Sequence, residues 1–193
     1  MALGRGGAPV DWLVVGLGNP GAEYDGTRHN VGFEVGSVLG SRWGLGKPRS
    51  RYRGLLREGR VAPSAPRVAL LLPQTYMNDA GTSVGPARGA YGLPLDRVLV
   101  VHDEIDLPFG EIRVRVGGGL AGHNGLKSVR DGLGSPEFAR VRVGVGRPPT
   151  TDPDRVAAYV LGRFREPRSE VADLIERAAD ATEEIVLGET SPS

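Results

Sequence analysis

The fold is decided by the stretch Val10–Gly32, which reads VDWLVVGLGNPGAEYDGTRHNVG. Its apolar run, Trp12–Val15, has the length and β-branched content of a buried strand. The run passes directly into Gly16–Gly21, where three glycines and a proline end the strand and allow a tight turn. Polar and titratable side chains come next, namely Tyr24, Asp25, Arg28, His29 and Asn30. Polar groups directly after a core strand are typical of the binding site of an α/β protein.

Two interpretations of this stretch compete. The glycine spacing of Gly16–Gly21 matches the dinucleotide-binding fingerprint, which also requires a helix and an acidic residue about 20 residues further on. Pro20 and later glycines interrupt the helical pattern, and no apolar strand ending in an acid arrives near position 40. The alternative is a site loop that presents His29, with Asn19 and Tyr24 as its neighbours. The sequence favours this second interpretation, which needs support from the rest of the chain.

Length and composition indicate one globular domain. A chain of 193 residues can bury a sizeable core, and its charged share of 24% suits a water-soluble protein. We expect a flexible tail at residues 1–9, one domain at 10–188 and a second tail at 189–193. The chain has no cysteine, which excludes disulfides and thiolate chemistry. No apolar run approaches the length of a membrane span, and we expect a cytoplasmic location.

Charge is unevenly distributed, although the formal net charge is only +1. Residues 42–60 hold seven lysines and arginines against one acid, Glu58. Such a stretch is either part of a nucleic-acid-binding surface or an ordinary solvated face.

The rest of the chain alternates between strand and helix patterns. Strands are expected at 51–57, 68–72, 97–101, 111–116 and 138–145. Helices are expected at 31–39, at 78–92 with Asn78 as the N-cap, from about Asn124, and from 167 to 188. The glycine-rich segment 117–122 suits a mobile lid.

Several predicted strands and turns deliver polar groups into loops. Asn19 and His29 follow the first strand, Asn78 and Asp103 follow later ones, and Asn124 lies in a further loop. Histidine is well placed to accept a proton near neutral pH, a carboxylate can orient it, and asparagine amides can hold a peptide or a carbonyl oxygen.

Strand alternation limits which residues act together. His102 and Glu104 point to one face and Asp103 to the other, so His102 and Asp103 are not expected to cooperate. Two strands carry pairs of outward arginines, at 113 and 115 and at 140 and 142. These arginines either grip phosphates together or form a solvated strand face.

Residues that the sequence lacks narrow the choice of catalytic mechanism. The chain has no Gly-x-Ser-x-Gly elbow and no cysteine nucleophile. Three histidines with acids offer zinc ligands, but no His-Glu-x-x-His spacing supports a zinc site. A His–Asp pair that activates water is the economical choice, and the residues alone indicate a hydrolase that acts on a charged polymer.

Five separated motifs give a sharper prediction. They are GLGNPG at 16–21, TRHN at 27–30, YMN at 76–78, HDEIDLP at 102–108 and GHNGLK at 122–127. In this order and spacing the sequence resembles the bacterial peptidyl-tRNA hydrolase family. The resemblance implies an α/β fold, a single-domain α/β/α sandwich around a twisted mixed sheet. It also implies a monomeric esterase that needs no cofactor and no metal. Such an enzyme has no obligate protein partner and does not associate with a membrane. This enzyme would cleave the ester between a peptide and the tRNA 3′ end, so that the tRNA is reused in translation.

The resemblance also implies roles for individual residues. His29 is the base that activates water, Asp103 stabilises its working form, and Asn19 helps to distinguish blocked from free aminoacyl groups. Four further residues line the site that binds the peptide and the terminal nucleotide, namely Tyr24, Tyr76, Asn78 and Asn124. The family grips a tRNA phosphate at the positions of Arg115 and Arg142. Tyr76 stands where phenylalanine often occurs, and the chain ends without the basic tail of some members.

Two rivals remain at this stage. One is a non-catalytic RNA-binding relative that uses the same fold as a scaffold, and the other is a nucleotide-dependent enzyme.

Overall fold

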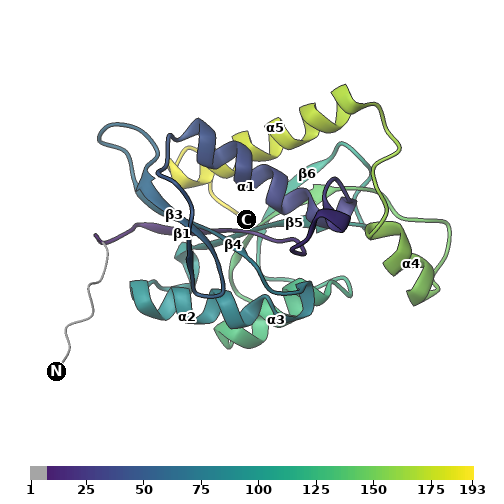
Figure 1. Ribbon diagram of the computed structural model, residues 1–193, viewed down its shortest axis with the longest axis horizontal. Coiled ribbons are helices and arrows are strands. Elements are labelled where there is room, and N and C mark those ends of the chain that lie inside the picture. The colour runs from purple at the N-terminus through teal and green to yellow at the C-terminus, as the bar shows by residue number, and fades with distance from the viewer. Residues whose placement is uncertain (1–7) are drawn as a thin grey trace.

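A seven-stranded mixed sheet forms the centre of the computed structural model, which describes residues 8–193 (Figure 1). The strands lie in the order β2-β3-β4-β1-β5-β7-β6, with β4, β1, β5 and β7 parallel and the other pairings antiparallel. Their bounds are β1 Trp12–Gly16, β2 Arg49–Arg51, β3 Gly54–Arg60, β4 Arg67–Pro73, β5 Val98–Glu104, β6 Ile112–Val116 and β7 Ala139–Gly144. Most of the tail predicted at residues 1–9 lies outside the described residues.

Helices cover both faces of the sheet and confirm the predicted α/β/α sandwich. In Figure 1, α1 (Val31–Arg42) and α5 (Arg168–Val186) lie on one side, and α2 (Gly81–Tyr91) and α3 (Asn124–Leu133) on the other. A further helix, α4 (Pro153–Val160), lies apart from both layers. Short 3-10 turns complete the chain: η1 Ala22–Tyr24, η2 Arg28–Asn30, η3 Met77–Asp79 and η4 Leu95–Arg97. No helix within residues 8–193 is long and apolar enough to cross a membrane.

The parallel strands are apolar on both faces because each face packs against helices. Val14, Leu70 and Leu99 belong to the core under α1 and α5. Leu13 and Leu71 belong to the core under α2 and α3. The uninterrupted apolar runs therefore predicted the central strands correctly.

The connections of β1 create a site at one edge of the sheet. The chain passes from β1 to β4 on one side, and then through α2 to β5 on the other side of β1. Ligands bind at such a reversal of strand order, outside the carboxyl ends of the strands. The loops after β1, β4 and β5 meet at this edge.

Three details of the predicted elements were wrong. The strand expected at 51–57 is a hairpin, β2–β3, because the chain turns at Tyr52 and Arg53. Asn78 does not cap α2, since the helix begins at Gly81 after the 3-10 turn η3. The strand expected at 97–101 continues as far as Glu104.

Side-chain orientation also differs at the sheet edge formed by β6 and β7. Arg140 is 1% exposed, so it is not the outward arginine that strand alternation predicted. Its two terminal guanidinium nitrogens donate to the carbonyls of Gly119 and Pro136, at 3.0 and 2.8 Å, while its Nε has no hydrogen-bond partner among the described residues. Val116, which strand alternation places on the inward face, opposite the outward arginines 113 and 115, is 38% exposed.

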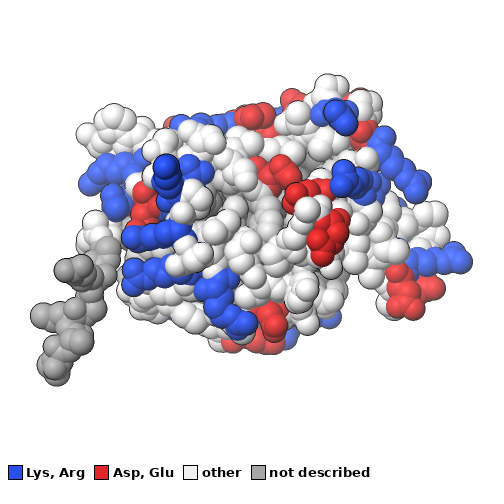
Figure 2. Space-filling view, in the orientation of Figure 1, with Lys and Arg blue, Asp and Glu red and all other residues white. Residues whose placement is uncertain are grey.

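Basic side chains with few acidic ones among them occupy one side of the face drawn in Figure 2. Figure 2 shows lysine and arginine on the left of the view, where β3 lies in Figure 1. The basic stretch at 42–60 contributes to this side through β2 and β3.

Candidate active site

A cavity of about 740 Å³ opens at the carboxyl edge of the sheet. Loops after β1, β4 and β5, the start of α3 and one side of α4 contribute its walls. Its polar lining includes Asn19, His29, Asn78, Asp103, His123, Asn124 and Lys127. The structure thus brings together side chains that are more than 100 positions apart in the sequence.

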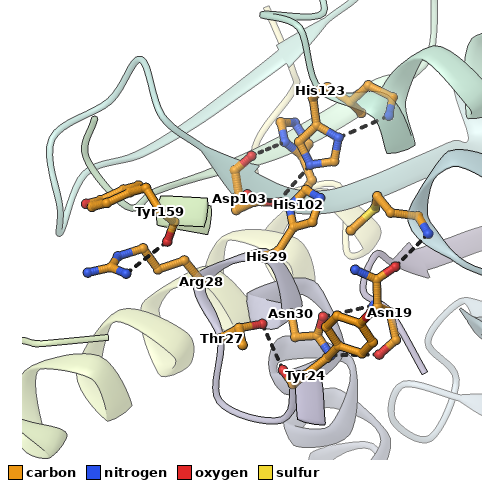
Figure 3. A network of polar contacts seen from close by, with 12 residues as sticks. Asn19, Tyr24, Thr27, Arg28, His29, Asn30, His102, Asp103, His123 and Tyr159 are labelled. Atoms are coloured by element: carbon orange, nitrogen blue, oxygen red, sulfur yellow. Dashed lines mark hydrogen bonds and ion pairs between the residues drawn. The ribbon is translucent and has the colours of Figure 1, made fainter. Parts of the chain in front are cut away.

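A histidine–aspartate pair lines the cavity, and Figure 3 shows its two side chains pointing toward one another. His29 Nδ1 lies 2.9 Å from Asp103 Oδ2. Asp103 comes from the end of β5, and His29 from the turn η2 directly before α1. The two elements approach closely because residue 32 is a glycine. A Cβ at Gly32 would lie 2.5 Å from the carbonyl oxygen of Val101.

A second histidine contacts the same carboxylate, and sequence reasoning assigned it no role. His123 Nε2 lies 2.7 Å from Asp103 Oδ1. Its Nδ1 accepts the backbone N–H of Leu126 at 3.2 Å, as the N-cap of α3. Since Nδ1 is an acceptor, Nε2 carries the proton and donates to Asp103. One feature of the sequence could have indicated a role for His123: it stands directly before the helix predicted from about Asn124.

The pair is electrostatically coupled. Burial alone would raise the pKa of Asp103, but His29 and His123 lower that pKa well below its usual range. Burial disfavours the charged form of His29, but the Asp103 carboxylate outweighs it and raises the pKa of His29. With Asp103 ionised, His29 donates from Nδ1, and its Nε2 remains an acceptor.

Asn19 is held rigidly beside this pair. Its Oδ1 accepts the backbone N–H of Met77 at 2.7 Å. Its backbone N–H donates to Asn30 Oδ1, and Asn30 Nδ2 donates to the carbonyl of Asn19, both at 2.9 Å. Because Oδ1 is occupied by Met77, the amide nitrogen of Asn19 is the group left for a ligand. The glycine loop leads into the 3-10 turn η1, so it serves as a site loop and does not open a helix.

His102 is separated from the pair, as strand alternation predicted. Its Nδ1 donates to the backbone carbonyl of Asp103 at 2.8 Å and makes no contact with the carboxylate. The ring is 1% exposed, and its Nε2 has no hydrogen-bond partner among the described residues. Burial, with the nearby His123, lowers the pKa of His102 to about 3. The ring is a neutral, buried support behind the site.

The other predicted site residues divide into two groups. Tyr76, Asn78 and Asn124 line the cavity, and Tyr76 is 62% exposed. Tyr24, Arg115 and Arg142 lie outside the lining. Arg142 forms an ion pair with Glu104 at 3.0 Å.

Arg28 connects the turn η2, which carries His29, to α4, and sequence reasoning predicted neither this contact nor the helix. Its guanidinium lies 4.0 Å from the centre of the Tyr159 ring and donates to the Tyr159 carbonyl at 3.0 Å. Its backbone N–H donates to the carbonyl of Gly162, also at 3.0 Å. Since α4 lines the cavity, Arg28 positions one wall of the site next to His29.

The three grouped side chains also offer metal ligands. The ligand atoms of His29, Asp103 and His123 lie within 4.8 Å of one another. Each nitrogen–oxygen contact, however, has the length of a hydrogen bond, 2.9 and 2.7 Å. A zinc ion about 2.0–2.1 Å from both nitrogens would displace both protons. The donor set therefore fits a hydrogen-bonded base better than a metal.

The sheet order and this site define an α/β protein with a hydrogen-bonded histidine–aspartate pair in an amide-lined cavity. The family model described as peptidyl-tRNA hydrolase matches residues 13–192. The chain belongs to the peptidyl-tRNA hydrolase family.

Individual relatives agree along almost the whole chain. The peptidyl-tRNA hydrolase of Mycobacterium sp. (strain KMS) is 50% identical over 183 residues, which cover 94% of this chain and 93% of the relative. That of Syntrophotalea carbinolica is 48% identical, with 89% and 88% covered. The solved structure of the Acinetobacter baumannii enzyme has a TM-score of 0.81 at 36% identity and covers 95% of this chain and 92% of its own.

Proposed function

We propose that this protein hydrolyses the ester between a peptide, or an N-blocked amino acid, and the 3′ end of tRNA. The substrate follows from family membership over residues 13–192. The observation that carries the mechanism is the 2.9 Å contact between His29 Nδ1 and Asp103, which leaves His29 Nε2 as a free acceptor. The product is tRNA that translation can reuse.

The reaction needs one proton acceptor and no covalent intermediate. His29 Nε2 takes a proton from a water molecule, whose oxygen attacks the ester carbonyl carbon. The Asp103 carboxylate stabilises the imidazolium that forms. When the tetrahedral intermediate collapses, the bond to the terminal ribose oxygen breaks and that oxygen receives the proton. The products are a peptide carboxylic acid and tRNA.

Asn19 gives a physical basis for choosing blocked substrates. Its Oδ1 is occupied by Met77, so it offers N–H donors to the ligand. A peptide carbonyl accepts such a donor, whereas the ammonium group of a free aminoacyl ester is itself a donor and is disfavoured.

Cavity-lining side chains supply the remaining contacts. Exposed Tyr76 presents a ring on which the terminal base can stack, and Asn78 and Asn124 offer hydrogen bonds to the peptide or the nucleotide. Tyr24, which lies outside the lining, is a further proposed contact from the loop after β1. Arg115 and Arg142 are proposed phosphate contacts, although a phosphate at Arg142 would compete with Glu104.

Other expectations remain predictions of this proposal. They are a monomer without an obligate protein partner, a cytoplasmic location, and activity without cofactor or metal. The last is tested by assaying hydrolysis in excess chelator, where the rate is expected to stay unchanged.

The decisive experiment compares N-acetyl-aminoacyl-tRNA with the same aminoacyl-tRNA left unblocked. The native protein is expected to cleave the blocked ester much faster. Asn19→Asp is the matched variant, because it keeps the acceptor for Met77 and removes the donor; it should lose most of this preference. Equal cleavage of both esters by the native protein would contradict the proposed selectivity. Binding of tRNA without any cleavage would favour a non-catalytic scaffold.

A further inference from the structure

The β2–β3 hairpin brings part of the basic stretch to the edge of the sheet where the cavity opens. In the sheet register Arg51 pairs with Gly54, and Gly54 pairs with Pro73 at the carboxyl end of β4. The backbone N–H of Gln74 donates to the carbonyl of Arg53 at 2.8 Å. Because Tyr76, two residues beyond Gln74, lines the cavity, the hairpin tip neighbours the cavity wall.

Arginines in the body of the hairpin are used by the fold itself. Arg57 donates to the carbonyls of Leu45 and Gly46, both at 2.8 Å. Arg49 forms an ion pair with Glu58. These side chains therefore hold the hairpin together and are not free for a ligand.

Arginines at the hairpin tip are different. Arg51 is exposed, and its guanidinium lies 5.0 Å from the centre of the Tyr52 ring. Arg53 is exposed and donates to the Thr82 hydroxyl at 2.9 Å. Within residues 8–193, no acidic side chain lies within ion-pair distance of either guanidinium.

The turn that presents these arginines is strained. Tyr52 and Arg53 both have positive φ, 51° and 53°. A two-residue hairpin turn of this kind normally uses Asn-Gly, because at positive φ a Cβ comes close to the following carbonyl oxygen, a contact that Gly avoids and Asn tolerates. Unfavourable backbone retained at an exposed tip is a reason to look for function.

The opposite edge of the sheet offers less free charge. Arg140 is buried, Arg142 is paired with Glu104, and Arg113 lies 3.5 Å from Glu111. This leaves Arg115 as the one arginine of β6 and β7 that is neither buried nor in an ion pair among residues 8–193. A polyanion that leaves the cavity on the side of the hairpin would meet the uncompensated positive charge of two arginines, Arg51 and Arg53.

We propose that Arg51 and Arg53 bind backbone phosphates of the tRNA acceptor arm outside the cavity. The inference rests on the proposed function, because an ester held at His29 places the 3′ nucleotides in the cavity and the acceptor arm beyond its mouth. Contacts to phosphates carry no sequence information, which suits an enzyme that accepts many tRNAs.

The test compares two substrates and three proteins. The substrates are an N-acetyl-aminoacyl-tRNA and the same N-acetyl-aminoacyl ester on the trinucleotide CCA. The proteins are native, Arg51→Glu, and the control Arg168→Glu. Arg168 is exposed at the start of α5, on the face of the sheet opposite α2.

Arg51→Glu is expected to lower kcat/KM on full-length tRNA about 5- to 10-fold and to leave hydrolysis of the CCA ester unchanged. The plot of log affinity against log salt should become shallower by about 1. Arg168→Glu should match the native protein on both substrates.

Equal rates for Arg51→Glu and Arg168→Glu on full-length tRNA would overturn the inference. An equal loss on both substrates would also overturn it, because the effect would then lie in the cavity. If the native protein cleaves neither ester, it is the proposed function that fails. An Arg51→Gln variant with an intermediate loss confined to full-length tRNA would support the charge explanation.

Discussion

His123 and Asp103 are joined by a 2.7 Å hydrogen bond on the carboxylate oxygen that His29 does not use. The direction of this bond is fixed by the fold, because the other nitrogen of His123 caps α3 at Leu126. Asp103 thus accepts from two imidazoles at once, and the start of α3 determines how the carboxylate faces His29. The base is oriented by two elements, β5 and α3.

Replacing this carboxylate should damage catalysis without unfolding the site. Asp103→Asn has one acceptor oxygen for two imidazole N–H donors, so its amide nitrogen must face one of them. We expect kcat to fall by about 10²- to 10⁴-fold, while tRNA affinity stays close to native. Single-turnover rates and a separate binding assay measure the two effects. A variant with native kcat would show that Asp103 does not support the base.

The pH dependence of the native enzyme should report His29. The base must be unprotonated, so kcat rises with pH and levels off above the pKa of His29. Because Asp103 raises that pKa, the midpoint should lie above the usual value of about 6.5. In Asp103→Asn the lowering effect of burial is no longer opposed, and the midpoint should move to lower pH. Identical midpoints in the two proteins would contradict this assignment.

Arg28 should act on substrate binding through α4. Arg28→Met removes the hydrogen bond and the cation–π contact to Tyr159. We expect KM to rise several-fold with kcat nearly unchanged, and the free energy of unfolding to fall by about 1–3 kcal/mol. Arg28→Lys, which keeps the charge, should lie between native and Arg28→Met. A loss confined to kcat would show that Arg28 acts on His29 instead.

His102 should make the fold sensitive to acid. Its pKa is about 3 in the folded protein and about 6.5 in the unfolded chain, so only the unfolded chain takes up a proton between these values. The free energy of unfolding therefore decreases as pH falls through this range, by at most about 1.4 kcal/mol per pH unit from this group. His102→Asn keeps a donor for the Asp103 carbonyl and removes the titration. Denaturant unfolding at pH 7, 5 and 4 should show a smaller loss in this variant, and equal losses would refute the prediction.

Sequence reasoning was most successful for features that depend on residues close together in the chain. The central strands are uninterrupted apolar runs, which only burial on both faces explains. His29, Asn19 and Asp103 were predicted as site residues because each comes at the end of such a run or in the loop that follows it.

The missed features depend on contacts between distant segments. The role of His123 rests on its bond to Asp103, 20 positions away, and the burial of Arg140 rests on carbonyls that accept from it. The Tyr52–Arg53 turn has none of the usual turn residues. Helix α4 is short and buries none of its residues, although two signals were available: the apolar side chains Val156, Ala157 and Val160 share one side, and Asp152 followed by Pro153 is an N-terminal signal.

The central claim is that His29 activates water in a metal-independent ester hydrolysis. The most direct measurement is single-turnover hydrolysis of an N-blocked aminoacyl-tRNA in excess chelator by native protein and by His29→Ala, with tRNA binding measured in parallel. The account predicts rapid cleavage by the native protein and a loss of about 10²- to 10⁴-fold in the variant, with tRNA affinity retained. Equal rates for the two proteins would contradict it.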